Sequence, residues 1–446
     1  MLNWFENYLC GRYQRVVING SASGWLPIRA GVPQGSILGP LLFLLFINDI
    51  VTDVKAEIKL FADDTSLYLI VDDPNDTANI LNSDLDKIHK WSEQWLVTFN
   101  AQKTETLIIS RKKNKPDHPP LYMNTQPLQN VTSHKHLGLN ISNDGFWHEH
   151  IDYIIQKSYR RINFLRKCRM ILSRYALEKL YISYIRPILE YADVVWDTNN
   201  QTLVNKLESV QIEAARIITG GTRLTSITKL YDETHWETLA ERRKQHKLVL
   251  FYKMANNNTP FYLSNLVPNT VGRRHDHNTR QTNNILNINT RTSLYSEYFL
   301  PSVIKLWNTL DQHIKSSESI SIFKRQIKSQ NEKVPIYFYV GSRLGQILHT
   351  RLRLNCSSLN SHLFFKNIVQ SPVCNCGEIE TTAHYLFNCP RYNNIRQEFL
   401  SSLDDIPIQI STHLLIHGSD QLSDEQNIFI FLATQSYIIK SKRFCG

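Results

Sequence analysis

The sequence lacks the features of secreted and membrane proteins. Its start, Met-Leu-Asn-Trp-Phe-Glu, has no basic segment followed by an apolar one, so we expect no signal peptide. The apolar run from Ile37 to Ile47 spans eleven residues, whereas a membrane span needs about 20. The cysteines number seven, an odd count without the regular spacing of a disulfide framework, which favours a reducing compartment. We therefore expect a nuclear or cytoplasmic protein with no transmembrane segment.

The charge balance favours an anionic partner. The chain has 446 residues, enough for two to four domains, and a net charge of +10. Such a balance is most often associated with nucleic acid. Residues 151–190 alone carry a net charge of +6, although a solvated helix surface is the alternative interpretation. The basic stretch Arg111–Lys115 is either a nuclear address or a surface loop.

Two adjacent aspartates, Asp63 and Asp64, interrupt an apolar stretch that runs from Leu60 to Ile70. Apolar residues on both sides predict strand, turn and strand, with both carboxylates at the turn. Two like charges held together on a hairpin are commonly offset by a divalent cation, and Mg²⁺ binds through one or two carboxylates plus substrate phosphates. A solvated Asp-Asp turn is the alternative for the dipeptide alone.

A glycine-containing loop precedes this hairpin. Gly31 and Gly35 allow the backbone to approach a ligand closely. Ser36 is a candidate N-cap for the helix that follows, and Pro40 suits its first turn. We expect the apolar residues from Ile37 to Ile47 to form a buried core helix.

These segments, in this order, resemble the palm of reverse transcriptases. The blocks that carry the resemblance are Gly31-Val-Pro-Gln-Gly-Ser36 and Phe61-Ala-Asp-Asp64, with Asn100-Ala-Gln-Lys-Thr104 and His136-Leu-Gly-Leu139 further along. The spelling is similar to that of non-LTR retrotransposons of the Jockey and chicken-repeat-one type. Tyr184–Ala192 and Gln211–Arg216 are similar to the thumb of the same class.

The resemblance implies an α+β fold. Residues 1–145 would form a partial polymerase palm, an antiparallel sheet with helices, followed by a mostly helical thumb at 146–255. It also implies an RNA-directed DNA polymerase that takes an RNA template, a DNA primer and deoxynucleotides, with Asp63 and Asp64 as Mg²⁺ ligands. The other positions assigned to nucleotide or nucleic acid are Gln34, Gly35, Lys103, Leu137, Gly138, Arg160, Arg161, Arg166 and Lys167.

Helical periodicity dominates the rest of the chain. A helix of about twenty residues is expected after Asp76, and its predicted buried stripe is Leu81, Leu85, Ile88, Trp91 and Trp95. Pro187 should break or kink a thumb helix. Residues 256–295 are poor in apolar side chains and are predicted to be a linker or loose loop. Helical segments are expected at 296–372 and in a tail at 393–446.

A cysteine–histidine cluster lies between them, at 373–392. Cys374, Cys376, His384 and Cys389 give the spacing C-x-C-x7-H-x4-C, and three thiolates with one imidazole would complete a tetrahedral, structural Zn²⁺ site. Gly377 suits the tight turn of such a zinc-knuckle-like module. The alternative is three buried cysteines and a core histidine. Arg391 and Arg396 are candidate nucleic-acid contacts of this region.

One expected part of the polymerase site is missing. The resemblance implies a further carboxylate from a strand upstream of the glycine loop, but the only acidic residue before Asp49 is Glu6, which does not match that block. We therefore expect an N-terminally truncated polymerase, inactive or weakly active alone. The alternatives are a non-catalytic nucleic-acid-binding remnant of a retroelement, or a chain that is not made or does not fold because its palm sheet has an unpaired edge. The oligomeric state is unknown from sequence.

Overall fold

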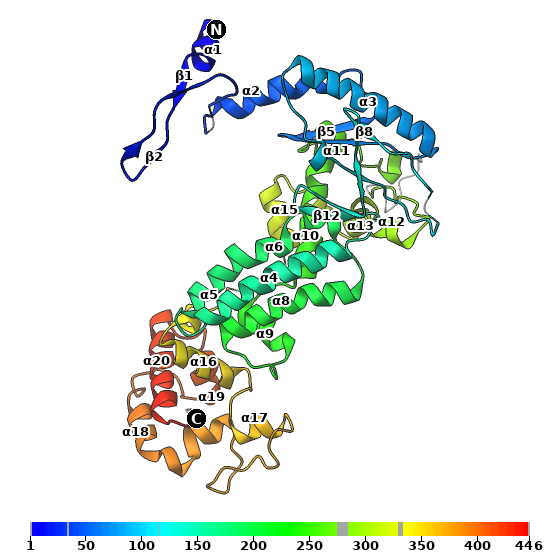
Figure 1. The fold of residues 1–446 in the computed structure, drawn as a ribbon. Coiled ribbons are helices and arrows are strands. Elements are labelled where there is room, and N and C mark those ends of the chain that lie inside the picture. The colour runs from blue at the N-terminus through cyan, green and yellow to red at the C-terminus, as the bar shows by residue number, and fades with distance from the viewer. Residues whose placement is uncertain (1, 34, 115, 274–283, 329–332, 445–446) are drawn as a thin grey trace. The chain divides into compact units, whose positions relative to one another are not determined.

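A computed structural model describes residues 2–33, 35–114, 116–273, 284–328 and 333–444. The chain divides into two compact units, residues 1–146 and 147–446 (Figure 1). Strands occur in the first unit, whereas the second is built from helices and loops, so the described chain mixes helix and sheet as the α+β prediction requires. None of the described helices is long and apolar enough to cross a membrane.

The first unit contains short strands and three helices. The helices are α1 (Leu2–Leu9), α2 (Leu38–Ile47) and α3 (Pro74–Gln94). The strands are β1 (Arg12–Gln14), β2 (Val17–Ile18), β3 (Ser21–Ala22), β4 (Leu26–Ile28), β5 (Glu57–Phe61), β6 (Asp64–Tyr68), β7 (Glu105–Leu107), β8 (Tyr122–Met123), β9 (Gln126–Pro127), β10 (Gln129–Val131), β11 (Ser133–His136) and β12 (Leu139–Ser142).

The strands pair two by two. The antiparallel pairs are β1–β4, β2–β3, β5–β6, β8–β9 and β11–β12, and β7 pairs with β10 in parallel. The prediction of one antiparallel palm sheet is therefore corrected for the described residues, since each strand has only one partner. Most of these strands have two to four residues, too few to present a long ladder to a further neighbour.

Helix α3 begins at Pro74, earlier than the predicted start after Asp76. The Asp73 carboxylate accepts hydrogen bonds from two backbone N–H groups of the first turn, at 2.8 and 2.9 Å, and Pro74 is the first helical residue. Leu85 and Ile88 are buried as predicted. Trp95 was predicted on the same buried stripe but is 40% exposed. It follows the last helical residue, so the helical spacing no longer sets the direction of its side chain.

Helix α2 is not buried, contrary to the prediction from its apolar run. Leu41, Leu44 and Leu45 are 53, 52 and 67% exposed. One side of the helix does reach α3, where the rings of Phe46 and Trp91 lie 6.1 Å apart. An apolar sequence favours burial, but burial also needs a facing surface, and the described residues supply one to only part of α2.

The described part of the second unit is built from helices joined by loops. Its helices are α4 (His148–Cys168), α5 (Arg174–Leu180), α6 (Arg186–Glu190), α7 (Asp193–Trp196), α8 (Gln201–Thr219), α9 (Ile227–Thr234), α10 (Leu239–Ala255), α11 (Phe261–Ser264), α12 (Ser293–Glu297), α13 (Phe299–Asn308), α14 (Gln312–Lys315), α15 (Ile320–Ile327), α16 (Arg343–Arg353), α17 (Asn360–Phe364), α18 (Asn393–Ser401), α19 (Thr412–His417) and α20 (Asp424–Lys440).

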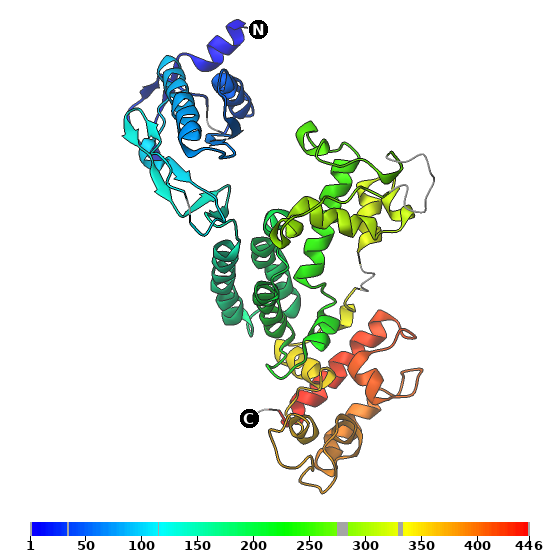
Figure 2. The ribbon, with the colours of Figure 1, turned by 90° about the vertical axis from the view of Figure 1, so that its right-hand side faces the viewer.

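Helices α4 and α8 pack against each other at the centre of this unit (Figures 1 and 2). Ile151 and Ile162 of α4 are fully buried, as are Leu207 and Val210 of α8. The expected break at Pro187 takes the form of a π-helical turn, Tyr181–Ile185, between α5 and α6. A proline cannot donate a backbone hydrogen bond, and a π turn is a common way for a helix to absorb that loss.

Two further apolar cores complete the unit. Helices α10, α13 and α15 enclose Phe251, Trp307 and Phe323. Ile285 joins this core and is 8% exposed, and the Asn308 side-chain amide hydrogen-bonds both its N–H and its C=O. The prediction of a loose loop at 256–295 is therefore corrected at Ile285, while residues 274–283 of that segment lie outside the described residues. The second core joins α16, α19 and α20 to the cysteine–histidine segment.

Candidate functional site

The aspartate pair lies on a tight hairpin between β5 and β6. Phe61 pairs with Asp64, so Ala62 and Asp63 are the two turn residues. Ala62 has a φ of +53°, a conformation that L-residues other than glycine rarely adopt. Asp63 and Asp64 are both exposed. The strand, turn and strand that the apolar flanks predicted are present, and both carboxylates are open to solvent and to a ligand.

A buried carboxylate that the sequence analysis missed holds this hairpin in place. Asp84 of α3 is fully buried, and one of its oxygens accepts the backbone N–H groups of Lys55 and Ala56 at 2.9 and 2.8 Å. The other oxygen accepts a hydrogen bond from the Lys87 ammonium at 3.0 Å. These bonds tie the start of β5 to α3. The sequence feature that could have indicated the burial of Asp84 is its position beside the apolar face of the predicted helix.

The glycine loop takes the backbone conformation that its glycines permit. Gly31 and Gly35 have φ values of +79° and +81°. The Ser36 hydroxyl accepts a hydrogen bond from the Gly39 N–H at 3.1 Å and another from the Tyr8 hydroxyl at 2.6 Å. Ile37 occupies the N-cap position of α2, so Ser36 lies one residue before the position predicted for it. Gln34, which was predicted to face template or nucleotide, lies outside the described residues.

Leu137 and Gly138 form the two-residue turn of the β11–β12 hairpin. Their φ values are +45° and +84°, as a type I′ turn requires at both central positions. Leucine in this conformation is strained, and such strain is typical of positions where function constrains the backbone. Lys103 ends a short 3-10 turn whose first N–H groups are capped by the Asn100 side chain, and it is exposed.

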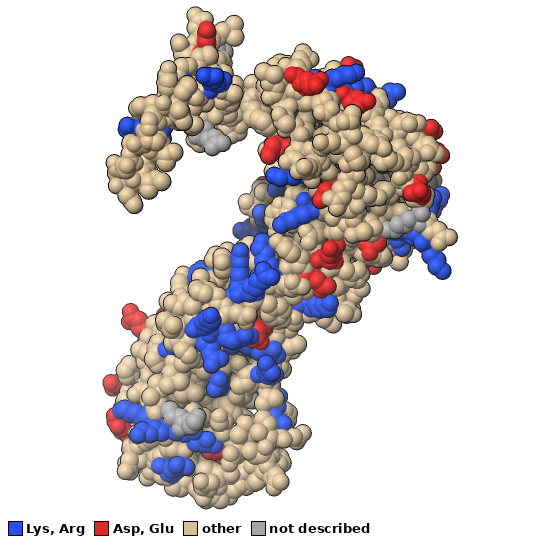
Figure 3. Space-filling view, in the orientation of Figure 1, with Lys and Arg blue, Asp and Glu red and all other residues tan. Residues whose placement is uncertain are grey.

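The predicted basic residues of α4 fall into two groups. Arg160 and Lys167 are exposed. Arg161 donates to the carbonyl of Tyr184 and stacks on that ring at 3.8 Å, and Arg166 pairs with Glu213 of α8 at 2.6 Å. The first group is open to an external partner, whereas the second also holds the helices together. Lys and Arg side chains gather on one face of this unit, over α4, α5 and α8 (Figure 3).

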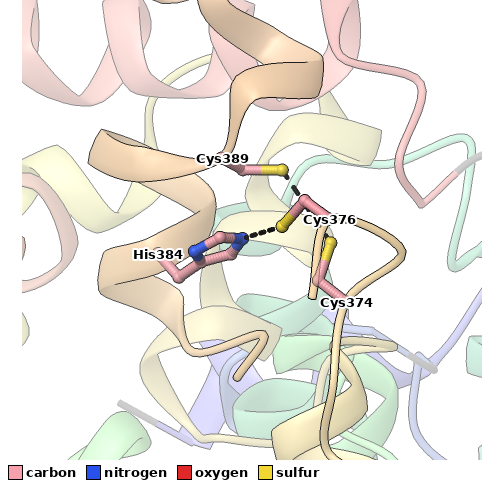
Figure 4. Close-up of side chains that lie close together, drawn as sticks. All are labelled: Cys374, Cys376, His384 and Cys389. Atoms are coloured by element: carbon pink, nitrogen blue, oxygen red, sulfur yellow. Dashed lines mark hydrogen bonds between the residues drawn. The ribbon is translucent and has the colours of Figure 1, made fainter. Parts of the chain in front are cut away.

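The four predicted zinc ligands come together. The ligand atoms of Cys374, Cys376, His384 and Cys389 all lie within 4.8 Å of one another. Cys374 Sγ and Cys389 Sγ are 3.8 Å apart, and Cys376 Sγ is 3.3 Å from His384 Nε2 (Figure 4). The C-x-C-x7-H-x4-C spacing predicted this set, and the fold brings all four side chains together.

The surroundings of the cluster suit a metal site. The one-residue gap between Cys374 and Cys376 is accommodated by a turn in which the Gly377 N–H donates to the Cys374 carbonyl at 2.9 Å, with Gly377 at a φ of +95°. His384 Nδ1 lies 2.9 Å from a carboxylate oxygen of Glu378, which leaves Nε2 for a metal. A carboxylate that orients a ligating histidine is the usual outer partner in such sites. Sequence spacing carried no signal for Glu378.

Burial separates the thiols. Cys374 and Cys389 are buried in the C-terminal core, whereas Cys376 is exposed. A backbone hydrogen bond from Glu378 lowers the pKa of the Cys376 thiol, and burial raises the pKa of the Cys389 thiol to about 11. A cation among these sulfurs would favour the thiolate form.

One predicted contact residue is corrected. Arg396 was considered as a nucleic-acid contact, but it is 6% exposed and donates to the carbonyl of Cys389. It therefore supports the loop that carries a cluster cysteine. Arg391 is exposed.

The cluster also differs from the aspartate hairpin in completeness. Among the described residues, the cysteine–histidine set is the only group of three or more His, Cys, Asp or Glu side chains whose ligand atoms lie close together. Asp63 and Asp64 have no third such residue beside them in this part of the chain. The described hairpin therefore offers two carboxylates to a cation, which is fewer protein ligands than the cluster offers.

Comparison with known proteins identifies the first unit. Residues 1–141 match the family model described as Reverse transcriptase (RNA-dependent DNA polymerase). Residues 1–141 are therefore similar to a reverse transcriptase domain. The Asp-Asp hairpin, the glycine loop and the β11–β12 turn all fall within this domain.

The relatives are retrotransposon proteins. The chain is 27% identical over 254 residues to the Probable RNA-directed DNA polymerase from transposon BS of Drosophila melanogaster, which is 54% of this chain and 28% of that protein. It is 29% identical over 227 residues to the RNA-directed DNA polymerase from mobile element jockey of the same species, 48% of this chain and 24% of that protein.

A longer match reaches the second unit. The Retrovirus-related Pol polyprotein from type-1 retrotransposable element R1 of Bradysia coprophila is 21% identical over 381 residues, 83% of this chain and 35% of that protein. The chain thus spans about a quarter to a third of the length of these relatives. The predicted resemblance to non-LTR retrotransposon polymerases is confirmed.

Proposed function

We propose that this chain is the palm, thumb and C-terminal part of an RNA-directed DNA polymerase, and that Asp63 and Asp64 are its Mg²⁺ ligands. The observation that carries this proposal is the exposed Asp-Asp hairpin inside the reverse transcriptase domain. In nucleotidyl transfer, Mg²⁺ activates the primer hydroxyl and braces the phosphate that is transferred. The hairpin presents both carboxylates on a turn that Asp84 anchors to α3.

The residues around the hairpin take supporting roles in this proposal. Gly35, and Gln34 beside it, would lie against the template or the incoming deoxynucleotide. Lys103, an exposed cation, would attract the pyrophosphate. The strained turn of Leu137 and Gly138 supports a role at the primer end, because backbone strain of this kind is common where function constrains the chain.

The second unit would hold the nucleic acid. We assign residues 146–255 to a thumb whose exposed cations, Arg160 and Lys167, contact phosphates of the primer–template duplex. Arg161 and Arg166 would contribute charge while also bonding within the protein. The net charge of +10 supports this assignment.

The cysteine–histidine cluster fits a structural Zn²⁺ ion. Three sulfur ligands and one nitrogen fill a tetrahedral shell and leave no open position for a reaction. The oriented histidine and the burial of Cys374 and Cys389 support a role in holding the C-terminal core together. When bound, zinc would stabilise the fold.

We further propose that the chain by itself is inactive or weakly active as a polymerase. Two adjacent carboxylates with no third beside them among the described residues should bind Mg²⁺ weakly. Each 1.4 kcal/mol lost from transition-state stabilisation costs about tenfold in rate. A non-catalytic nucleic-acid-binding role is the second candidate, and the basic face of the second unit favours it.

Primer extension on a primed RNA template, with Mg²⁺ and deoxynucleotides, tests the proposal together with a binding assay on the same template. We expect the full chain to bind the template and to extend the primer little or not at all. Adding Mg²⁺ should increase binding of the template with a deoxynucleotide, and Asp63→Asn should remove that increase. Asp72→Asn, at another exposed carboxylate of the same unit, is the matched control.

The outcomes separate the alternatives. Failure to bind primed RNA would overturn the polymerase and remnant readings together. Template binding without any Mg²⁺ effect at Asp63 would favour the non-catalytic role. Clear extension that Asp63→Asn abolishes would show that the metal site is complete in this chain and would refute the proposed inactivity.

A further inference from the structure

An arginine-lined pocket lies where α4, α8 and α16 meet. Its volume is about 180 Å³, and its lining includes Arg166 and Arg169 from the end of α4 and Arg216 from α8. Arg223, from the loop after α8, and Arg351 of α16 complete the cationic lining, and Glu213 of α8 is the only carboxylate in it. The pocket therefore concentrates positive charge between a thumb-like helix pair and the C-terminal core.

Much of this charge is uncompensated. Glu213 pairs with Arg166 at 2.6 Å and reaches Arg216 at 3.9 Å. The Arg216 Nε–H is buried and has no hydrogen-bond partner among the described residues. Arg169 and Arg223 are exposed and, in the described part of the chain, have no side-chain ion pair. One carboxylate cannot neutralise five guanidinium groups, so the pocket favours an anion.

The wall formed by α16 is held closely against α8. Gly220 ends α8 at a φ of +80°, and a Cβ added there would lie 2.7 Å from the Ile347 side chain. Arg351 Nε donates to the carbonyl of Gly220 at 2.9 Å. Arg343 donates to the carbonyls of Ile217 and Arg169, each at 2.8 Å. These contacts pre-organise the pocket, so a ligand would not have to order it.

We propose that this pocket binds a phosphate group, and that its source is the backbone of a nucleic-acid strand. Guanidinium groups form paired, charge-assisted hydrogen bonds with phosphate oxygens. The volume is below the roughly 300 Å³ at which pockets begin to hold drug-sized molecules, so it suits a single phosphate rather than a whole nucleotide. The exposed guanidinium groups of Arg169 and Arg223 in the pocket lining supply donors for that phosphate.

The nucleic-acid strand as the source of the phosphate rests on the proposed function. The pocket itself does not depend on that function. It extends the expected contact surface beyond α4 to Arg216, Arg223 and Arg351. Inorganic phosphate carries the same chemistry, so the experiment needs one arm for each source.

The test compares two double variants of the full chain. Arg169→Gln with Arg223→Gln removes two exposed pocket cations. Lys305→Gln with Lys324→Gln removes the same charge from α13 and α15, at exposed positions outside the pocket. Because all four residues are exposed, neither variant should unfold, and thermal denaturation checks this.

Binding of a labelled single-stranded RNA is followed by fluorescence anisotropy at several salt concentrations. We expect the pocket variant to bind the RNA about tenfold more weakly, because a tenfold loss corresponds to one charge-assisted hydrogen bond. The slope of log affinity against log salt should fall by about 0.7, the value for one phosphate contact on a single strand. The control variant should change both quantities much less. Calorimetry with inorganic phosphate forms the second arm, and the same variant should lose phosphate binding.

A variant that removes a negative charge from the pocket, instead of a positive one, distinguishes an electrostatic effect on binding from a structural one. Glu213→Gln removes the only carboxylate of the pocket and should tighten binding of both ligands, whereas Glu318→Gln, at an exposed position in the α14–α15 loop, should not. If only phosphate binding depends on the pocket, the phosphate site stands but its nucleic-acid source is refuted. The inference would be overturned if the pocket and control variants lost the same RNA affinity. It would also be overturned if the pocket variant changed neither RNA binding nor inorganic phosphate binding. Neither result depends on polymerase activity.

Discussion

A buried ion triad joins α5, α9 and α16, and Glu233 is its centre. Glu233, Arg174 and Arg353 are 2, 1 and 5% exposed. Arg353 donates to both carboxylate oxygens of Glu233, at 2.7 and 2.8 Å, and Arg174 donates to the carboxylate and to the Glu233 carbonyl. Glu233→Gln would remove the negative charge and leave two buried guanidinium groups without it.

The size of this effect follows from the electrostatics. Burial raises the pKa of Glu233, but Arg353 and Arg174 outweigh it and lower the pKa from 4.5 to about 2. At about 1.4 kcal/mol for each pH unit of difference, the ionised state contributes about 3 kcal/mol to the free energy of unfolding. Breaking a buried ion pair by removing one partner typically costs about 3–5 kcal/mol, so both routes give a similar loss.

Urea denaturation at pH 7, followed by tryptophan fluorescence, measures the free energy of unfolding. Trp236 stacks on Tyr181 with ring centroids 4.5 Å apart and reports on this region. The matched control is Asp152→Asn, which breaks an exposed pair with Lys206. That pair is half exposed at both ends, and its loss should cost less than about 1 kcal/mol.

A pH series checks the sign. Because the folded pKa of Glu233 is lowered, its contribution is present above pH 4.5 and disappears as the pH falls toward about 2. The difference between the wild-type protein and Glu233→Gln should shrink over that range. The reasoning fails if Glu233→Gln costs no more than Asp152→Asn at pH 7, or if the difference does not shrink in acid.

Three further predictions concern other parts of the chain. Cys376→Ser removes an exposed cluster ligand without disturbing the core. The zinc content measured by mass spectrometry should therefore fall from one ion per chain toward none. A variant that keeps its full zinc content would contradict the proposed zinc site. Asp84→Asn should lower the free energy of unfolding of the first unit by about 1–2 kcal/mol, because its hydrogen bonds to the backbone before β5 lose charge assistance. An unchanged urea midpoint would argue against a stabilising role for the Asp84 carboxylate. Leu137→Gly should raise the free energy of unfolding by up to about 1 kcal/mol, since glycine tolerates the φ of +45°. A lower melting temperature would show that side-chain contacts of Leu137 stabilise the fold by more than the backbone strain costs.

Local patterns predicted several elements correctly because neighbouring residues decide them. The apolar flanks of Asp63 and Asp64 predicted their hairpin, and helical spacing predicted α3, although the helix begins at Pro74 and not after Asp76. The cysteine and histidine spacing predicted a set of four residues whose ligand atoms do converge. The residues that determine the hairpin lie within a few positions of one another, and the four cluster residues fall within one short segment, 374–389.

Predictions that depended on distant surfaces failed. Helix α2 is apolar along its length, yet Leu45 is 67% exposed, because only part of the helix has a facing surface among the described residues. Trp95 continues the α3 spacing but lies beyond the end of that helix. Arg396 looks like a surface cation in sequence but is buried against the carbonyl of Cys389.

The sequence by itself predicted the resemblance to reverse transcriptases, the aspartate hairpin and the cysteine–histidine set, because each depends on residue types in short blocks of sequence. Only the tertiary structure decided which charged groups are buried and which face one another. Asp84 reaches the start of β5, Glu233 joins Arg174 to Arg353, and arginines from α4, α8 and α16 surround one pocket. The physical reason is that the energy of a charge depends on its burial and partners, and chain folding sets both.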